Sequence, residues 1–358
     1  MNYNSIIPTK KRNTYKWLGL FLALNILGSM SAQQLSKKKV SKSEMETSNK
    51  KTSAYLFTYF SGNGKDKEAI RFAISKDGYN FSALNNNMPV ISSAQISSTG
   101  GVRDPHILRG ADGETFYMVA TDMNTSKNGW GPTYAMVLLK SKDLVNWTSH
   151  VVNIPQNFPE LATVSKIWAP QTIFDPEKGK YMIYWSMSFG DGPIKLYYAY
   201  TNPNFSGLAT TPKQLFFSPD DSTCLDGDIV FKEGKYHLFF KATGMHPGIK
   251  QAVSDKLTEG YVFQDKRLEQ TDQDVEGSGI YKLNNSDTWI LMYDLYRNGK
   301  YQFTKTKDLE HFTLIDQEVT MNFHPRHGTV MPITAKEAKK LESKWGYEKK
   351  DTGSTNSN

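Results

Sequence analysis

The stretch LDGDIVFKEGKYHLFFKA, residues 225–242, contains a unit from which the rest of the chain can be interpreted. An aspartate and a glycine open a short apolar run, Glu233-Gly234 supplies a turn, and an aromatic run follows. Apolar runs of this length, bounded by turn residues, predict two buried strands joined as a hairpin. Similar units recur along the chain, so internal repetition is tested before any fold is assigned.

Five aromatic-rich runs resemble the second strand of this unit: AYLFTYFS from Ala54, TFYMVATD from Thr115, KYMIYWSM from Lys180, KYHLFFKA from Lys235 and WILMYDLY from Trp289. Four of them follow a turn pair: Asp112-Gly113, Lys178-Gly179, Glu233-Gly234 and Asn284-Asn285. A polar phrase lies downstream of each run: SKDGYNF from Ser75, SKDLVNWT from Ser141, TNPNF from Thr201, SDKL from Ser254 and TKDLEHF from Thr306. The repeated unit is therefore strand, strand, polar turn and aromatic residue.

A third recurrence lies upstream of the turns, in the phrases RDPHIL from Arg103, WAPQTIF from Trp168, LDGDIVF from Leu225, VEGSGIY from Val275 and RHGTVM from Arg326. The second residues of these phrases are 65, 57, 50 and 51 positions apart. Such spacing fits four-stranded propeller blades with loops of variable length. The phrases predict the innermost strands of five blades.

The order of the phrases also predicts how the ring closes. The last inner phrase has no outer strands after it, and the runs at Ala54 and Arg71 have no inner strand before them. We therefore predict an all-β, five-bladed propeller over residues 53–334, whose last blade joins N- and C-terminal strands and leaves no long exposed edge. A β-sandwich is the alternative, but it would not predict five equivalent phrases. Residues 335–358 are predicted to form a short helix and a flexible tail.

Composition narrows the class of protein further. The 358 residues are 38% hydrophobic and contain 19 Phe, 19 Tyr and 7 Trp, which favours strands over helical bundles. A single cysteine, Cys224, excludes a disulfide scaffold and a thiolate zinc site. Of 43 basic and 36 acidic residues, ten and two lie in residues 1–51, which leaves 33 and 34 in the remainder. Because the predicted domain is almost neutral, we do not expect it to bind nucleic acid.

The first 32 residues have the order of a secretory signal peptide. Basic residues precede an apolar run from Trp17 to Leu27, and small residues follow it. An uncleaved membrane anchor is the alternative, although the run is shorter than the ~20 residues that a spanning helix needs. Residues 33–52 are polar and without periodicity, as in a disordered linker. We expect a secreted or periplasmic protein with no stable membrane insertion after cleavage; its oligomeric state is not predicted.

The aligned position of the five inner phrases holds the candidate chemistry. It contains three acidic residues, an alanine and a histidine: Asp104, Ala169, Asp226, Glu276 and His327. In a propeller these positions converge at one mouth of the central channel. Carboxylates gathered there are costly to desolvate unless they perform chemistry or bind an ion, although strand-end acids can also satisfy turn N–H groups. Inverting glycoside hydrolysis needs such an acid and base about 6.5–9.5 Å apart.

The phrases RDPHI, WAPQTIFD, LDGDIVF, VEGSGIYK and PRHGTV, in this order, resemble glycoside hydrolase family 43 from about Ser53 to Thr334. The resemblance implies a five-bladed propeller that acts by inversion. It implies that Asp104 is the general base, Asp226 the residue that adjusts the pKa of the acid, and Glu276 the general acid. His327 matches a family histidine near the channel axis that is often associated, through water, with a cation such as calcium. No other cofactor is implied.

Residues beside the aligned position are candidates for substrate binding. Trp168 could stack on a sugar face or belong to the core. Arg103 and Arg326 could hydrogen-bond sugar hydroxyls or steady carboxylates, with structural ion pairing as the alternative. His327 is also a candidate for substrate binding. The chain departs from the common family pattern at Gln171, where an aspartate often stands, and at Gly227, where a proline often stands. These departures leave the binding subsites open.

We therefore predict an inverting glycosidase that releases a terminal sugar from side chains of plant cell-wall polysaccharides. The favoured sugar is α-L-arabinofuranose. A β-xylosidase, or a galactosidase or galactofuranosidase of the same fold, is one alternative. A carbohydrate-binding propeller without catalysis is another. A retaining fructan-type hydrolase is disfavoured, because the sequence lacks the Asn-Asp-Pro-Asn-Gly phrase of those enzymes.

Overall fold

The computed structural model describes residues 51–64, 66–245 and 247–346. The predicted signal peptide and all but the last two residues of the predicted linker lie outside these ranges, as does the predicted tail from residue 347. No helix within the described ranges is long and apolar enough to cross a membrane.

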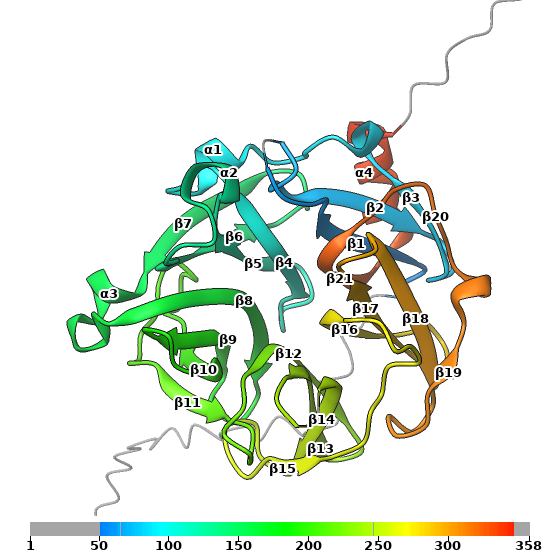
Figure 1. The fold of residues 1–358 in the computed structure, drawn as a ribbon. Helices are drawn as coiled ribbons and strands as arrows, with labels where there is room; N and C mark the ends of the chain where they lie inside the picture. The colour runs from blue at the N-terminus through cyan, green and yellow to red at the C-terminus, as the bar shows by residue number, and fades with distance from the viewer. Residues whose placement is uncertain (1–50, 65, 246, 347–358) are drawn as a thin grey trace, which may run out of the picture. The chain divides into compact units, whose positions relative to one another are not determined.

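Five antiparallel blades surround a central axis, as predicted (Figure 1). Blade I comprises β4 (Val102–Arg109), β5 (Phe116–Asp122), β6 (Ala135–Ser141) and β7 (Trp147–Asn153). Blade II comprises β8 (Val164–Asp175), β9 (Lys180–Phe189), β10 (Lys195–Tyr200) and β11 (Lys213–Phe216). Blade III comprises β12 (Cys224–Lys232), β13 (Lys235–Ala242), β14 (Gly248–Ser254) and β15 (Val262–Gln264). Blade IV comprises β16 (Glu276–Lys282), β17 (Trp289–Leu295), β18 (Lys300–Thr306) and β19 (Thr313–Leu314).

Blade V is built from both ends of the chain. Its inner strand β21 (Arg326–Ile333) pairs antiparallel with β1 (Ala54–Phe60), which continues into β2 (Arg71–Ser75) and β3 (Asn80–Ala83). This confirms the predicted closure. The structure adds a short fifth strand that the sequence pattern did not indicate, β20 (Thr320–Met321), which pairs parallel to β3.

The polar phrase downstream of each aromatic run forms the turn before the outermost strand. In blade V, Asp77 Oδ1 accepts the N–H groups of Tyr79 and Asn80, each at 2.8 Å. In blade I, Asp143 Oδ1 accepts the N–H groups of Val145 and Asn146. A short acidic side chain that satisfies two backbone donors explains why the Ser/Thr-Lys-Asp phrase recurs at this corner.

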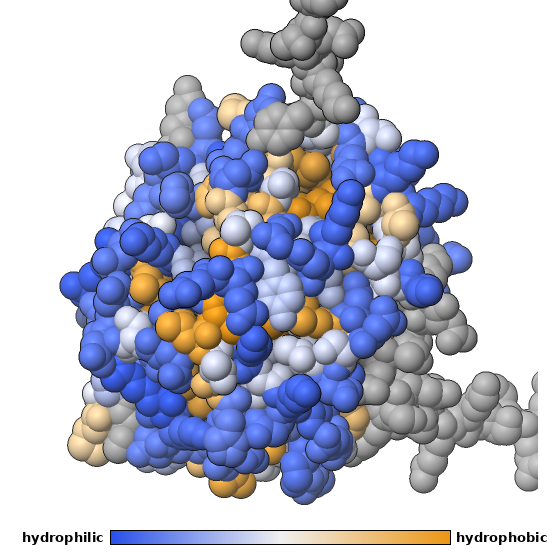
Figure 2. Space-filling model, turned by 90° about the vertical axis from the view of Figure 1, so that its right-hand side faces the viewer, coloured by the Kyte–Doolittle hydropathy of each residue, from blue (hydrophilic) through white to orange (hydrophobic). Residues whose placement is uncertain are grey.

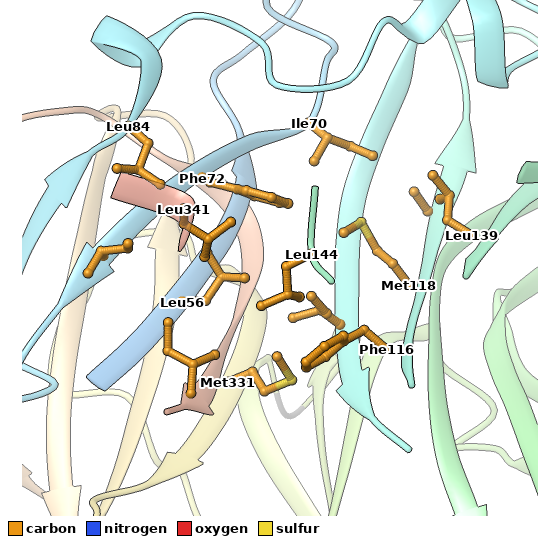
Figure 3. Packing of buried hydrophobic residues seen from close by; sticks show 14 of the residues in the cluster. Leu56, Ile70, Phe72, Leu84, Phe116, Met118, Leu139, Leu144, Met331 and Leu341 are labelled. Atoms are coloured by element: carbon orange, nitrogen blue, oxygen red, sulfur yellow. The ribbon is translucent and has the colours of Figure 1, made fainter. Parts of the chain in front are cut away.

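The hydrophobic core is divided into five clusters, one at each interface between neighbouring blades. The cluster between blades V and I, drawn in Figure 3, joins Leu56, Phe72 and Met331 to Phe116 and Met118. The outer surface seen in Figure 2 is mostly hydrophilic with scattered hydrophobic patches, as expected where outer strands meet water. The blades are therefore held to one another by buried apolar side chains.

Four α-helices of the described chain lie outside the blades. Three are single turns in loops: α1 (Ser93–Ile96), α2 (Thr125–Asn128) and α3 (Ile154–Asn157). The fourth, α4 (Ala335–Trp345), lies where the sequence predicts a helix and begins with a capping box between Thr334 and Glu337. It buries Leu341 in the cluster between blades V and I (Figure 3).

Candidate active site

Each inner strand carries a β-bulge within its inner phrase, where two residues of the inner strand face one residue of the second strand. The first bulge residue in blades I to IV has a positive φ angle: 52° at Asp104, 45° at Ala169, 54° at Asp226 and 60° at Gly277. Non-glycine residues seldom adopt this conformation, and such strain is concentrated at functional sites. The bulges re-aim the side chains where the inner strands begin.

The register corrects one part of the sequence alignment. Gly277, and not Glu276, occupies the bulge position of Asp104 and Asp226, so aligning the second letters of the phrases was wrong by one residue in blade IV. The physical reason is steric as well as conformational: a Cβ on residue 277 would lie 2.8 Å from Cγ of His327. Glu276 therefore belongs to the position just before the bulge, which Trp168 occupies in blade II.

Two of the predicted carboxylates converge on His327. The Nδ1 atom of His327 lies 3.7 Å from Oδ1 of Asp104 and 4.0 Å from Oδ1 of Asp226. The second oxygen of each aspartate is held by a hydrogen bond, from the Thr121 hydroxyl to Asp104 at 2.8 Å and from the Gly277 N–H to Asp226 at 3.0 Å. Both aspartates are fixed in orientation, with one oxygen of each facing the imidazole.

Glu276 completes the predicted acidic set from the first position of β16. Its Oε1 accepts a hydrogen bond from Arg326 Nη2 at 2.8 Å, and its Oε2 lies 3.7 Å from Nζ of Lys241. With a quarter of its side chain exposed, Glu276 is the most open of the three acids. The exposure suits a group that must reach a substrate atom.

The pKa of Glu276 is raised above its usual range. Burial is the main cause, and the negative charge of Asp226 raises the pKa further. The positive charges of Lys241 and Arg326 oppose this effect, and the neighbouring His327 also lowers the pKa. A carboxyl group whose pKa is raised keeps its proton closer to neutral pH, as general acid catalysis requires.

Arg326 lies between two acids. Besides binding Glu276, its Nε donates to Oδ2 of Asp294, which is fully buried at the end of β17. Its guanidinium carbon is 5.7 Å from the ring centroid of Phe60. The prediction that Arg326 could steady a carboxylate agrees with these contacts, and its role in binding a sugar stays a prediction.

Two more predicted binding residues, Trp168 and Arg103, lie around Trp130. The ring of Trp168 meets that of Trp130 edge to face at 6.5 Å, and the guanidinium of Arg103 lies 5.1 Å from the Trp130 ring. Arg103 Nη1 also donates to Asn63 at 2.7 Å and to Glu68 at 3.0 Å, so part of its donor capacity serves a buried ion pair. Trp130 itself is 59% exposed and is a surface on which a sugar ring could stack.

A second polar layer lies two residues further along the inner strands. His106 accepts the N–H of Thr172 on Nδ1 at 3.3 Å, and burial lowers its pKa to about 3, so the ring is neutral. Asp228 accepts the N–H of Ile280 at 2.8 Å, and burial raises its pKa to about 7. Both side chains link one blade to the backbone of the next, which assigns them a structural role.

The side chains around His327 offer few direct ligands for the calcium ion that the resemblance allows. In the part of the chain that the structure describes, no group of three or more His, Cys, Asp or Glu side chains is placed to hold a metal ion. Calcium takes six to eight oxygen ligands, and the residues around His327 do not fit that requirement by themselves. A cation held through water near His327 stays a prediction, and no catalytic step below depends on it.

Several residues of the site were not predicted from the sequence. Lys241 and Asp294 were read only as parts of buried strands, and Thr121, Phe60 and Trp130 were not singled out. Each of the first two is a charged residue near the end of a mostly apolar run, in KYHLFFKA and WILMYDLY.

The fold and the acidic site together define a propeller of the glycoside hydrolase class. The chain belongs to glycoside hydrolase family 43: a related family model described as "probable glycosyl hydrolase domain" matches residues 50–339. A curated α-L-arabinofuranosidase of Bifidobacterium longum is 26% identical over 137 residues, which are 35% of this chain and 12% of that protein.

Solved structures show the same fold at low sequence identity. A xylan β-1,4-xylosidase from Bacillus halodurans has a TM-score of 0.54 at 13% identity, over 77% of this chain and 55% of that chain. An exo-1,5-α-L-arabinanase from a bovine ruminal metagenomic library has a TM-score of 0.50 at 19% identity, over 74% of this chain and 93% of that chain. The chain thus spans about half the length of that xylosidase and an eighth of the curated relative.

Proposed function

We propose that this protein is an inverting glycosidase that removes a terminal α-L-arabinofuranose from side chains of plant cell-wall polysaccharide. The observation that carries the proposal is the grouping of Asp104, Asp226 and Glu276 around His327 and Arg326 at one end of the inner strands. Family membership supports a carbohydrate substrate. The partial similarity to an arabinofuranosidase supports the sugar, over about a third of the chain.

In the proposed reaction, Asp104 and Glu276 act on opposite sides of the scissile bond. Asp104 takes a proton from a water molecule as its oxygen attacks the anomeric carbon, and Glu276 gives its proton to the departing glycosidic oxygen. Oδ1 of Asp104, which lies 3.7 Å from Nδ1 of His327, is the oxygen proposed for the first step, since Oδ2 accepts a hydrogen bond from Thr121. The charge of Asp226 favours the protonated form of Glu276 and so prepares the second step.

The leader supports a proposal about location. A charged, apolar and small-residue order in residues 1–32 is that of a cleaved signal, which would deliver the enzyme to the periplasm or outside the cell, where polysaccharide is found.

One assay tests the activity and the sugar together. Purified protein is incubated with aryl α-L-arabinofuranoside, β-D-xyloside, galactofuranoside and galactopyranoside, and release of the aryl group is followed for wild type and Asp104→Asn. We expect fastest release from the arabinofuranoside and at least a ~100-fold loss in the variant. If release is fastest from the xyloside or a galactoside, that sugar would replace arabinofuranose in the proposed function. Sugar binding without release from any substrate would indicate a binding propeller instead.

A further inference from the structure

A second ring of side chains stands behind the first. On the second strand of each blade, one residue pairs with the residue just before the bulge: Thr121, Ser186, Lys241, Asp294 and Phe60. Each of the five contacts the inner strand of the following blade. The ring is therefore a supporting layer for the residues that face the channel.

In two blades the support is a hydroxyl group. Thr121 Oγ1 accepts the N–H of Ala169 at 2.8 Å, and Ser186 Oγ accepts the N–H of Asp226 at 3.0 Å. In blade V the support is apolar, since the Phe60 ring lies 4.5 Å from the guanidinium of Arg103. Neutral side chains are thus sufficient to hold an inner strand at this position.

Blade IV instead has a carboxylate at this position, and burial of this carboxylate costs free energy. The Asp294 side chain is fully buried, its Oδ2 accepts from Arg326 Nε, and its Oδ1 has no hydrogen-bond partner among the described residues. Burial raises the pKa of Asp294, and the charge of Arg326 opposes this. A buried acid with one unsatisfied oxygen costs stability that a serine or threonine would not. This cost indicates that Asp294 has a role beyond support of the strand.

Arg326 connects Asp294 to the predicted general acid. The guanidinium is planar, so fixing Nε against Asp294 also fixes the direction of Nη2. Nη2 donates to Glu276 Oε1 at 2.8 Å. An oxygen that accepts this bond is the carbonyl oxygen of the protonated carboxyl group, and the proton is left on Oε2.

We propose that Asp294 is a positioning residue, which acts through Arg326 to hold Glu276 with Oε1 as acceptor and Oε2 as the oxygen that carries the transferred proton. The inference rests on the proposed function. In the step itself, the Oε2–H bond breaks and the proton passes to the glycosidic oxygen. That oxygen keeps the electron pair of the broken bond to the anomeric carbon, while the attacking water gives its proton to Asp104.

The test uses dependence on the leaving group. Asp294→Asn keeps the size of the side chain but removes its charge, so the ion pair that fixes Arg326 is lost and only a neutral acceptor is left. We expect kcat/KM to fall about 10- to 100-fold on an unactivated oligosaccharide, and less than about 3-fold on a dinitrophenyl glycoside, because an activated leaving group needs little protonation. Glu276→Gln is measured beside it and should show the same selectivity more strongly.

Asp122→Asn is the matched control. Asp122 is equally buried, one residue beyond Thr121 on β5, but its carboxylate binds Ser98 and Thr99 away from the ring. We expect this control to leave the ratio of the two rates unchanged. If Asp294→Asn does not fold, Arg326→Lys replaces it: a lysine keeps the charge opposite Asp294 but loses the second fixed donor, and the same selective loss is expected.

The two variants distinguish the positioning role of Asp294 from the proposed function. Equal losses on both substrates, or none, in Asp294→Asn while Glu276→Gln remains selective would overturn the positioning role and leave the proposed function standing. Unchanged rates in Glu276→Gln would overturn the assignment of the acid, and the positioning role with it.

Discussion

Glu276 lies between charges of opposite effect on its pKa. Burial and Asp226 raise the pKa, and Lys241, 3.7 Å from Oε2, lowers it. Removing Lys241 therefore leaves Glu276 protonated to a higher pH. Because loss of the acid's proton sets the basic limb of the activity profile, we expect Lys241→Met to move that limb upward by about one pH unit.

The measurement is kcat/KM against pH on the best substrate of wild type. Lys250→Met serves as control, since Lys250 is also a lysine of blade III in an ion pair but pairs with Asp265 at 3.0 Å, away from the ring. A basic limb that stays in place in Lys241→Met, or moves to lower pH, would contradict the electrostatic account of Glu276.

The general acid assignment predicts selectivity in its own right. Glu276→Ala removes the proton donor, so turnover of substrates with poor leaving groups should fall by about 10²–10⁴-fold. Activated aryl glycosides, which depart with little protonation, should lose less than about 10-fold. Steady-state rates on a series of aryl glycosides of different leaving-group pKa measure this, and a uniform loss across the series would argue against the acid role.

How far the sequence predicts the site can be judged from individual residues. The phrases located Asp104, Asp226 and His327, and the structure brings these three together. Glu276 was also located, but it was aligned with the wrong positions of the other blades. An alignment of letters does not reveal that the bulge residue with a positive φ angle in blade IV is Gly277. Asp294 and Lys241 were missed because a charge inside an apolar strand has no sequence motif, and only the strand register shows where it points.

At the scale of single elements, α4 stabilises the junction where the two chain ends meet. Leu341 is fully buried in the cluster between blades V and I. Arg109 of β4 binds Glu337 through two hydrogen bonds of 2.6 and 2.9 Å, and Lys340 binds Asp143 at 2.9 Å. The helix thus connects to blade I by charge and to both blades by apolar packing.

Leu341→Ala should lower the free energy of unfolding by about 2–5 kcal/mol, because it removes buried methyl groups and leaves a cavity. Urea unfolding followed by tryptophan fluorescence measures the change. Leu314→Ala on β19 is the control: that side chain is 46% exposed, and its loss should cost less than about 0.5 kcal/mol. Equal unfolding midpoints for Leu341→Ala and wild type would show that α4 does not stabilise this junction.

At the scale of the whole molecule, repetition in the sequence was enough to predict the fold. Five phrases in the same order gave five blades, and the incomplete first and last units gave the closure between β1 and β21. The long first interval has a simple cause, since the helices α2 and α3 are inserted between the inner strands of blades I and II. The short strand β20 escaped prediction because two residues carry no periodic pattern.

The ring explains why distant positions act as one site. Neighbouring inner strands are linked by side chains that reach the next blade, as Thr121 reaches Ala169 and Asp226 reaches Gly277. The bulges, the supporting ring and the clusters between blades hold three acids from three blades at one end of the inner strands. We propose that these acids act by direct displacement of the leaving group, with Asp104 activating water.

The most direct test is the configuration of the sugar when it is first released. Hydrolysis of the aryl α-L-arabinofuranoside is followed by proton NMR at high enzyme concentration, before the anomers equilibrate. We expect the β-anomer to form first, since water attacks from the face opposite the leaving group. First appearance of the α-anomer would require a covalent intermediate on the enzyme, and would contradict the role of Asp104 as general base.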